Sequence, residues 1–398
     1  MSHKYVLGRF SHGNEPVFII QNIAARLMYE DPDLDLVLPA PHRLGLIREI
    51  AQGQGIDKRR IYIDAEAHDI AVRYGVHWGA SKTSSGIAVS GPKDYAEWVM
   101  NNKTRGEKFY QELRIHYKKF TAVNLEGEEK QFTLANAEMV VNAGDLYDEF
   151  GDVPVIYPFP QRHSELLKRT GNPEFVEFAE MVRRREANRS INFIPEIHSL
   201  RYDRNYSPLH NEEFTPHMKE SPRPYDIEIP DDSIVMIFSG TGRNIETLKR
   251  IAEQTKHPVV TGMFSPVDGD RYIKIVPPRA EFVHVMGAKN SDGTLKVLAA
   301  VGQTGYGMNW GAWNAGIPVI FPGLEQGGDE EFRHNRETIL GMGLGLEISK
   351  PEDIDALIDI SQPQRDNVAA VNAQLVKKFG TLDGIGYIAR RIRELGLA

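Results

Sequence analysis

The stretch VLAAVGQTGYGMNWGAWNAGIPVIFP, residues 297–322, decides how the rest of the chain is interpreted. Its apolar run at 297–301 has the length of a buried parallel strand, and a small, glycine-rich cluster follows at 302–307. Residues 308–315 predict a helix, which a glycine and a proline end before a second buried strand at 318–321. The stretch therefore predicts a strand, glycine-rich turn, helix and strand within a parallel α/β sheet.

The glycine-rich turn has two possible interpretations. A helix N-terminus offers unpaired backbone N–H groups and a partial positive charge, and glycines let a ligand come close to the backbone. This favours an anion, most naturally a phosphate, at 302–307. Such turns also occur in parallel sheets for packing reasons alone, so both interpretations stay open on this stretch taken by itself.

A second unit of the same kind begins at Ser233. The apolar strand predicted at 233–238 leads directly into Ser239-Gly240-Thr241-Gly242-Arg243, and the following segment carries apolar residues on one helical face. A guanidinium binds two phosphate oxygens at once, so Arg243 is suited to the anion that the turn would hold.

A third unit of this kind opens the chain. Residues 5–8 predict a buried strand, apolar residues at helical spacing follow between Val17 and Met28, and 34–38 predict a second strand. This βαβ unit indicates a parallel sheet from the first residues onward.

Composition limits the class of protein. The chain has 398 residues, 41% hydrophobic and 26% charged, which is long enough for two soluble globular domains. A net charge of −8 gives no overall attraction to nucleic acid or anionic membrane. Cysteine is absent, which excludes disulfides, thiolate metal sites and a cysteine nucleophile. With no signal peptide and no long apolar run, we expect a cytoplasmic protein without a transmembrane segment, for which peripheral membrane contact stays open.

The connection between domains is predicted at 201–232, where five prolines occur with little periodicity. We expect a first domain at 1–215, a second at 216–380 and a C-terminal helix at 381–398. Further strands are predicted at 60–63, 86–90, 138–142, 153–157, 257–261, 272–276 and 281–285, and an inserted hairpin at 114–134.

The order of motifs after the opening stretch resembles the donor half of nucleotide-sugar glycosyltransferases with the two-Rossmann-domain (GT-B) architecture. Members of that family follow the glycine-rich turn and helix with AG(V/I)P, a strand that ends in proline, an Asp, a downstream Asn and a GxG. The matching residues here are Ala315-Gly316-Ile317-Pro318, Pro322, Asp329, Asn335 and Gly343 to Gly345. The spacing from Asp329 to Asn335 is also similar to the loop of lipid-linked N-acetylglucosaminyltransferases.

The resemblance implies an α/β fold of two Rossmann-like domains that face a central cleft, with the C-terminal helix crossing back to the first domain. It also implies that the turns of the second domain bind the donor diphosphate and that the acidic loop holds sugar hydroxyls. The implied donor-binding residues are Gly240, Thr241, Gly242, Arg243, Gln303, Thr304, Gly305, Gly307, Asn309, Asp329, Glu331 and Asn335.

The acceptor side would include His12, Gly13 and Asn14, in the loop after the first strand. His12 is the first candidate for the catalytic base because imidazole transfers protons near neutral pH. Asp145, after the strand at 138–142, is the competing candidate. The register of this loop differs from the family, in which glycine precedes the histidine.

Two positions depart from the family pattern. Gln303 stands where many members have His, and Gly311 stands where many have the Glu that holds the ribose. Asn309 or Asn314 is a candidate replacement for that ribose contact.

Together these observations predict an inverting glycosyltransferase that needs no metal or cofactor. It would move a hexosyl or N-acetylhexosaminyl group from a nucleotide diphosphate sugar, with a UDP-sugar favoured, to the hydroxyl of a small molecule, glycan or lipid. A nucleotide-sugar epimerase or hydrolase, supported by the acidic loop at 325–331, and a non-catalytic nucleotide-sugar binding protein are the alternatives.

Overall fold

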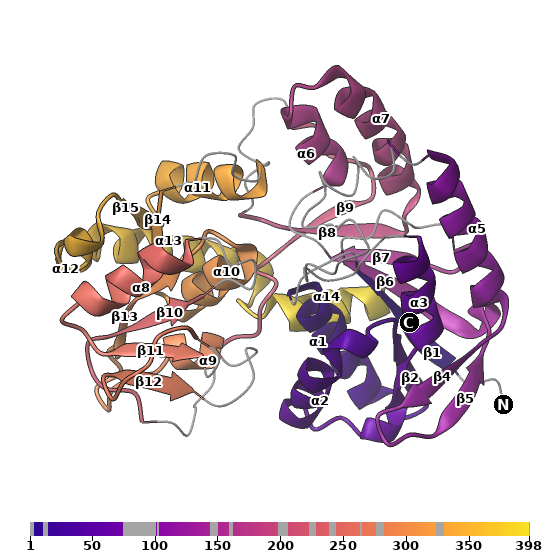
Figure 1. Ribbon diagram of the computed structural model, residues 1–398, viewed down its shortest axis with the longest axis horizontal. Helices are drawn as coiled ribbons and strands as arrows, with labels where there is room; N and C mark the ends of the chain where they lie inside the picture. Colours follow the sequence, from indigo (N-terminus) through magenta and orange to yellow (C-terminus); the bar gives the residue numbers. More distant parts are fainter. Residues whose placement is uncertain are drawn as a thin grey trace. The chain divides into compact units, whose positions relative to one another are not determined.

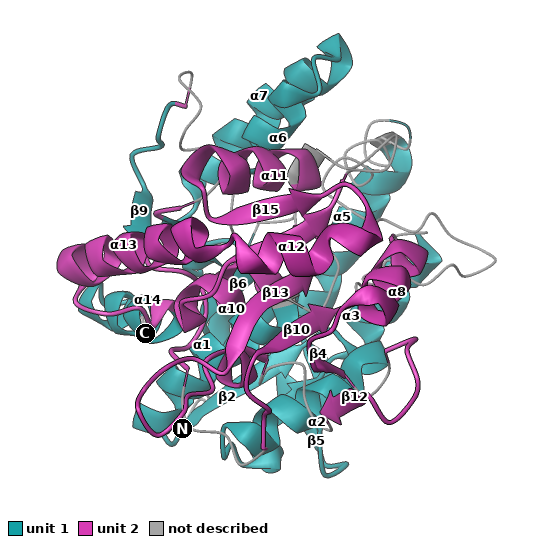
Figure 2. Ribbon diagram, turned by 90° about the vertical axis from the view of Figure 1, so that its left-hand side faces the viewer, with its two compact units in different colours: residues 1–195, 207–215, 385–398 teal, residues 196–206, 216–384 magenta. Residues whose placement is uncertain are grey.

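The computed structural model describes residues 4–10, 15–74, 101, 103–143, 150–158, 162–197, 206–222, 228–238, 244–262, 265–275, 282–323 and 330–397 (Figure 1). The chain divides into two compact units (Figure 2). Unit 1 comprises residues 1–195, 207–215 and 385–398, and unit 2 comprises 196–206 and 216–384. Each unit is an α/β domain built on its own sheet.

Unit 1 contains a nine-stranded sheet in the order β5-β4-β3-β2-β1-β6-β7-β8-β9. Its parallel strands are β1 (Lys4–Phe10), β2 (Leu34–Leu38), β3 (Ile61–Ile63), β6 (Ala137–Ala143), β7 (Val155–Pro158), β8 (Ile191–Pro195) and β9 (Glu212–Thr215). Most of them are buried and apolar, whereas the edge strand β9 is half-buried and carries two glutamates. The hairpin β4 (Phe120–Asn124) and β5 (Glu129–Phe132) extends one edge with antiparallel pairing.

The helices of unit 1 connect these strands. They are α1 (Glu15–Glu30), α2 (Leu44–Gly53), α3 (Ala65–Arg73), α5 (Lys103–Lys118), α6 (His163–Arg169), α7 (Pro173–Asn188) and α14 (Gly384–Glu394). The C-terminal helix α14 is bound to β9, since Arg391 Nε donates to Glu213 Oε1 at 2.7 Å and the Tyr387 hydroxyl donates to the same oxygen at 3.0 Å. The chain thus returns to unit 1 after it has built unit 2.

Unit 2 contains a six-stranded parallel sheet in the order β12-β11-β10-β13-β14-β15. The strands are β10 (Ser233–Ile237), β11 (Val259–Gly262), β12 (Tyr272–Ile275), β13 (Val297–Gly302), β14 (Val319–Pro322) and β15 (Gly345–Ile348). The helices are α8 (Ile245–Gln254), α9 (Phe282–Met286), α10 (Tyr306–Ala315), α11 (Glu330–Met342), α12 (Ile354–Asp359) and α13 (Gln362–Phe379).

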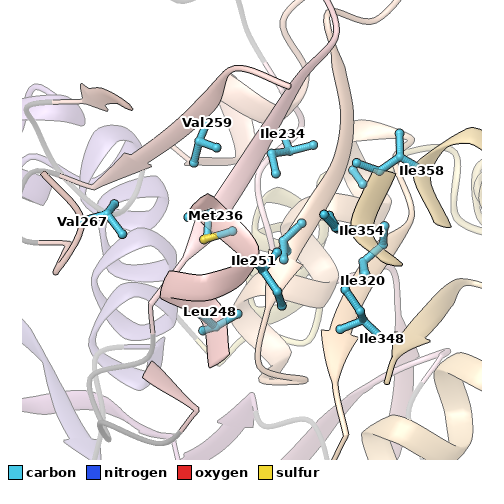
Figure 3. Close-up of a cluster of buried hydrophobic side chains, with 13 residues drawn as sticks. Ile234, Met236, Leu248, Ile251, Val259, Val267, Ile320, Ile348, Ile354 and Ile358 are labelled. Carbon is cyan, nitrogen blue, oxygen red and sulfur yellow. The ribbon is translucent and has the colours of Figure 1, made fainter. Parts of the chain in front are cut away.

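One face of this second sheet is covered by α8 and α12. Leu248 and Ile251 of α8 are fully buried in one apolar cluster with Met236 of β10, and Ile354 of α12 belongs to the same cluster (Figure 3). The apolar face that the sequence predicts for the helix after Ser233 is therefore the face that packs on the sheet.

Two of the predicted elements are wrong in part. The segment 114–118 is the end of α5, and the hairpin begins only at Phe120, because Leu113 and Tyr117 bury one helical face at i, i+4 spacing. Residues 282–286 form α9 and not a strand, since a short apolar run fits either a buried strand or a buried helical turn. The strand predicted at 86–90 lies outside the described residues. Within the described ranges, no helix is long and apolar enough to cross a membrane.

Candidate functional site

The candidate site in unit 2 lies where the strand order reverses. After β10 the chain adds β11 and β12 on one side, and then β13 pairs with β10 on its other side. Ligands of open parallel sheets bind outside the carboxyl ends of the strands at such a reversal. Ile237 at the end of β10 pairs with Gly302 at the end of β13. The two glycine-rich turns that the sequence singles out thus leave two neighbouring strands at one edge.

Packing alone accounts for Gly302. A Cβ atom there would lie 2.7 Å from the carbonyl oxygen of Ile237 and 2.7 Å from Met308 Sδ. Gly305 is different, because among the described residues its Cβ would meet only the ring of Phe332, at 3.9 Å, and its φ of −74° suits any residue. Packing among the described residues of unit 2 therefore requires glycine at position 302 but not at position 305.

Burial alternates from residue to residue at the start of α10. Gln303, Gly305 and Gly307 are half-buried, whereas Thr304 and Tyr306 between them are buried. Gly305 is the N-cap residue of α10 and gives no side-chain cap, so the first N–H groups of the helix rely on another partner. Together with the partial positive charge of the helix start, this arrangement is suited to an anion.

The side chains of two asparagines donate hydrogen bonds to the backbone of the turn. Asn335 Nδ2, from α11, donates to the carbonyl oxygen of Thr304 at 2.6 Å, and Asn309 Nδ2, from α10, donates to the same oxygen at 3.3 Å. Both side chains are buried. Their direct contact with a donor remains a prediction, and the contacts present here bind them to the turn itself.

The position of Gly311 faces an apolar helix. A Cβ atom there would lie 3.6 Å from Met286 Cε and 3.9 Å from Val283 Cβ, both of α9. Asn314, one suggested replacement for the ribose contact, is buried, and its amide nitrogen donates to the backbone carbonyls of Lys219, Glu220 and Leu382. Asn309 is likewise buried, and its amide nitrogen donates to Thr304, so a ribose contact by either residue remains a prediction.

Several of the predicted site residues lie outside the described residues, and Glu331 lies in α11 with its side chain not described. Those outside are His12, Gly13, Asn14, Asp145, Gly240, Thr241, Gly242, Arg243 and Asp329.

The strand order of unit 1 reverses between β1 and β6, which pair in parallel up to Phe10 and Ala143. His12 and Asp145 each follow one of these paired ends by two residues of chain. The two candidate bases, chosen from separate parts of the sequence, thus follow the two strands that bound one topological switch point.

The same edge of unit 1 holds a polar pair that the sequence analysis missed. Asp64, directly after β3, accepts from the backbone N–H of Ala67 and contacts Nε2 of His116 of α5 at 2.9 Å. Both side chains are buried, so this pair fixes α3 and α5 to the sheet. The signal was the position of Asp64 after a strand, but its partner is 52 residues away.

Among the described residues, no group of three or more His, Asp or Glu side chains is arranged to hold a metal ion.

No protein-family model and no curated protein matches the sequence, but solved structures match the fold. CalG4, the calicheamicin glycosyltransferase, is 13% identical, with a TM-score of 0.59 over 100% of this chain and 99% of that chain. The glycosyltransferase SsfS6 from Streptomyces sp. SF2575, in complex with thymidine diphosphate, is 10% identical, with a TM-score of 0.55 over 98% and 99%. UGT71G1 from Medicago truncatula, in complex with UDP-glucose, is 10% identical, with a TM-score of 0.56 over 98% of each chain.

These matches span both units and the helix α14 that returns to the first. The α/β architecture predicted from the glycine-rich turns is confirmed at the level of the fold. The chain therefore has the two-Rossmann-domain (GT-B) fold that these glycosyltransferases share.

Proposed function

We propose that this protein is an inverting glycosyltransferase that moves a sugar from a nucleotide diphosphate donor, with a UDP-sugar favoured, to an acceptor hydroxyl. The observation that carries the proposal is the edge of unit 2 where β10 and β13 end side by side and α10 begins with an uncapped, glycine-bearing turn. Two of the structural neighbours were solved with thymidine diphosphate and with UDP-glucose, which supports a nucleotide diphosphate as the ligand of this edge.

In this proposal the diphosphate is bound by electrostatics. The turn at 303–307 offers backbone N–H groups, and Arg243 supplies a fixed positive charge from the turn after β10. These groups would stabilise the charge that develops on the leaving diphosphate, so we propose that no metal is required. Asp329 and Glu331 would accept hydrogen bonds from the sugar hydroxyls.

The acceptor must lose a proton as the new glycosidic bond forms. We assign this step to His12, with Asp145 as the alternative, because each residue follows one of the two strands at the switch point of unit 1. Attack from the face opposite the leaving diphosphate would invert the anomeric carbon.

The face of α10 at Gly311 bears on which nucleoside the donor carries. The face of α10 at Gly311 meets the apolar side chains of Val283 and Met286, so no carboxylate holds the ribose from this position. Hydroxyl groups of the ribose would then contribute less to binding than the diphosphate does. UDP and thymidine diphosphate should accordingly be compared as ligands in the same titration.

The decisive experiment incubates the protein with radiolabelled nucleotide sugars and a panel of acceptors, and separates free sugar, epimer and transferred product. Transfer supports the proposal, whereas release of free sugar or formation of an epimer without transfer supports the hydrolase or epimerase. Nucleotide binding without any product would identify a binding protein. Adding EDTA to the transfer assay tests metal independence directly, since a required metal would abolish the product.

Two variants test the assigned roles. Arg243→Ala should weaken UDP binding by about 10- to 100-fold, which corresponds to a charge-assisted hydrogen bond, while Arg250→Ala on the exposed face of α8 should not. His12→Ala should lower turnover by about 10²- to 10⁴-fold at nearly unchanged UDP affinity. If His12→Ala keeps its turnover, the base is reassigned, and Asp145→Asn is the variant to measure.

A further inference from the structure

Thr304 is bonded to the rest of unit 2 in an unusual way. Its carbonyl group lies between the ladder of β13 and the ladder of α10, whose first intrahelical bond runs from Asn309 N to Gly305 O at 3.1 Å. A buried carbonyl outside both ladders needs another hydrogen-bond donor, and here two side chains provide it. Asn335 provides the shorter bond, at 2.6 Å, and Asn309 the longer, at 3.3 Å.

A second bond runs in the opposite direction. The hydroxyl of Thr304 donates to the backbone carbonyl of Phe332 at 3.3 Å, so Thr304 and α11 exchange two hydrogen bonds. The ring of Phe332 also lies against Gly305, the next residue of the turn. Thr304, Asn309 and Asn335 are at most 3% exposed, so water competes little for these bonds.

These bonds join two parts of the chain that the donor would contact separately. Thr304 belongs to the turn proposed to bind the diphosphate. Phe332 and Asn335 belong to the first turns of α11, which follows directly on the acidic segment proposed to hold the sugar. Thr304 is 28 residues from Phe332 and 31 residues from Asn335 in sequence, so contacts between sequence neighbours do not fix these two parts relative to each other.

We propose that Asn335 and Thr304 are positioning residues that fix the first turns of α11 against the turn at 303–305, so that the diphosphate and the sugar of the donor are held by one rigid unit. The proposal rests on the proposed function and assigns to Asn335 a role other than direct donor contact. The side chains of Asn335 and Thr304 are neutral, so the position of α11 that they fix does not change with pH.

Misalignment of the sugar should affect the chemical step more than binding of the diphosphate. Displacement of a reacting group by about 1 Å can cost about 100-fold in rate. We therefore expect Thr304→Val, which keeps the shape but loses the hydroxyl, to lower turnover by about 10- to 100-fold while UDP affinity changes by less than about threefold. Asn335→Ala should behave in the same way, and Thr304→Ser, which restores the hydroxyl, should recover most of the turnover.

The matched control is Asn367→Ala. Asn367 is an exposed asparagine of unit 2 whose amide also donates to a backbone carbonyl, that of Gly343 at 3.2 Å, but it lies on α13. This variant should retain turnover and UDP affinity. Turnover is measured with the nucleotide sugar that the wild type uses in the transfer assay, and UDP affinity by titration calorimetry.

Hydrogen exchange provides a readout that needs no activity. Loss of the hydroxyl bond should speed amide exchange in peptides that cover residues 332–338 by about tenfold, without the same change in peptides of α13. Equal exchange in Thr304→Val and the wild type would overturn the inference, as would loss of turnover and UDP affinity in equal proportion. If the wild type transfers no sugar at all, the proposed function fails, and the exchange experiment still decides whether the two segments are joined.

Discussion

The two ends of α10 both have asparagines that bind backbone carbonyls, but they differ in how the helix itself is capped. At the N-terminal end, Asn309 and Asn335 bind the carbonyl of Thr304, and the first N–H groups of the helix have no side-chain cap. At the C-terminal end, Asn314 binds three backbone carbonyls and Asn372 Nδ2 donates to the carbonyl of Trp313 at 2.6 Å.

The two ends differ in how the backbone N–H and carbonyl groups of the helix are bonded. The C-terminal carbonyls are bonded within the protein, since the N–H groups of Gly316 and Ile317 donate to Trp313 and Ala312. The N-terminal end differs, since its N-cap residue Gly305 makes no side-chain cap. In the proposed function this end of the helix binds the donor diphosphate, whereas the C-terminal end stabilises the fold. Variants at the C-terminal end should change the free energy of unfolding, and a variant that obstructs access to the backbone at the N-terminal end should change nucleotide affinity.

The largest effect on stability is expected at Asn314. Its amide nitrogen joins α10 to Lys219 and Glu220, just after the chain enters unit 2, and to Leu382, just before it leaves. Asn314→Ala removes the side chain that makes these three bonds and leaves the three carbonyls with fewer donors. The free energy of unfolding should fall on the order of 3 kcal/mol in urea titrations.

The exposed Asn367→Ala is the control for this variant and should cost much less. UDP affinity of folded Asn314→Ala should match that of the wild type. A loss of affinity without a loss of stability would break the distinction between the two ends.

The next effect depends on pH and comes from His217, which packs against Trp313 with ring centroids 5.6 Å apart. Burial lowers the pKa of His217 to about 4, because the imidazolium is poorly solvated in the interior. The unfolded chain takes up this proton below its ordinary pKa of about 6.5, whereas the folded chain does not. The stabilising contribution is therefore complete above about pH 6.5 and is lost as the pH falls to about 4.

The expected loss is about 3 kcal/mol over this interval. It should appear as a slope of unfolding free energy against pH that is smaller in His217→Gln than in the wild type. Asn367→Ala, which changes an exposed residue that does not titrate, should keep the slope of the wild type. If the wild type and His217→Gln show equal slopes between pH 4 and 6.5, His217 is not held neutral by the fold.

A smaller effect is expected at Gly316, the left-handed residue after α10, with φ of 85°. Within the described part of the chain its Cβ would meet only Leu295 Cδ1, at 3.7 Å, so conformation and not crowding would oppose an alanine. Gly316→Ala should cost about 1–2 kcal/mol of unfolding free energy. Gly341→Ala, in the helix α11 with open space around the added methyl, should instead be neutral or slightly stabilising.

The sequence allowed the fold to be predicted because its signals are local. Buried apolar strands that lead into glycine-rich turns mark parallel α/β units, and those at Tyr5, Ser233 and Val297 each begin a strand of the observed sheets. Where the local signal was ambiguous, the prediction failed. Residues 282–286 illustrate this, because burial of the whole segment removes the alternation that separates a strand from a helix.

The sequence was enough to locate the candidate site, but it did not show which residues contact one another there. The position of the turn after β13 was predictable, whereas the partners of Thr304 were not, because Asn335 is 31 residues away and its amide could have faced either the ligand or the protein. Asn314 shows the same limit. A single asparagine suggests a polar contact, and only the fold determines that its partners are backbone carbonyls of two distant segments.

The smallest effect on stability, and the sharpest test of the comparison, is expected at Gly305. Its φ of −74° is open to any residue, and of the residues that the structure describes an added Cβ would approach the ring of Phe332 alone, at 3.9 Å. Alanine is a slightly poorer N-cap than glycine but makes the unfolded chain less flexible, and these opposing contributions are each below about 1 kcal/mol. Gly305→Ala should therefore unfold at nearly the same urea concentration as the wild type.

Its binding of UDP should nevertheless weaken, by about tenfold or more, because a methyl group on this half-buried residue would stand where the diphosphate must approach the backbone. Gly302→Ala is the contrasting variant, since its Cβ would clash with Ile237 and Met308, and it should cost about 1–3 kcal/mol of stability. Titration calorimetry and urea unfolding of both variants separate the two roles. Full UDP affinity in Gly305→Ala would show that no ligand approaches the start of α10, and the binding role of this end of the helix would then have to be given up.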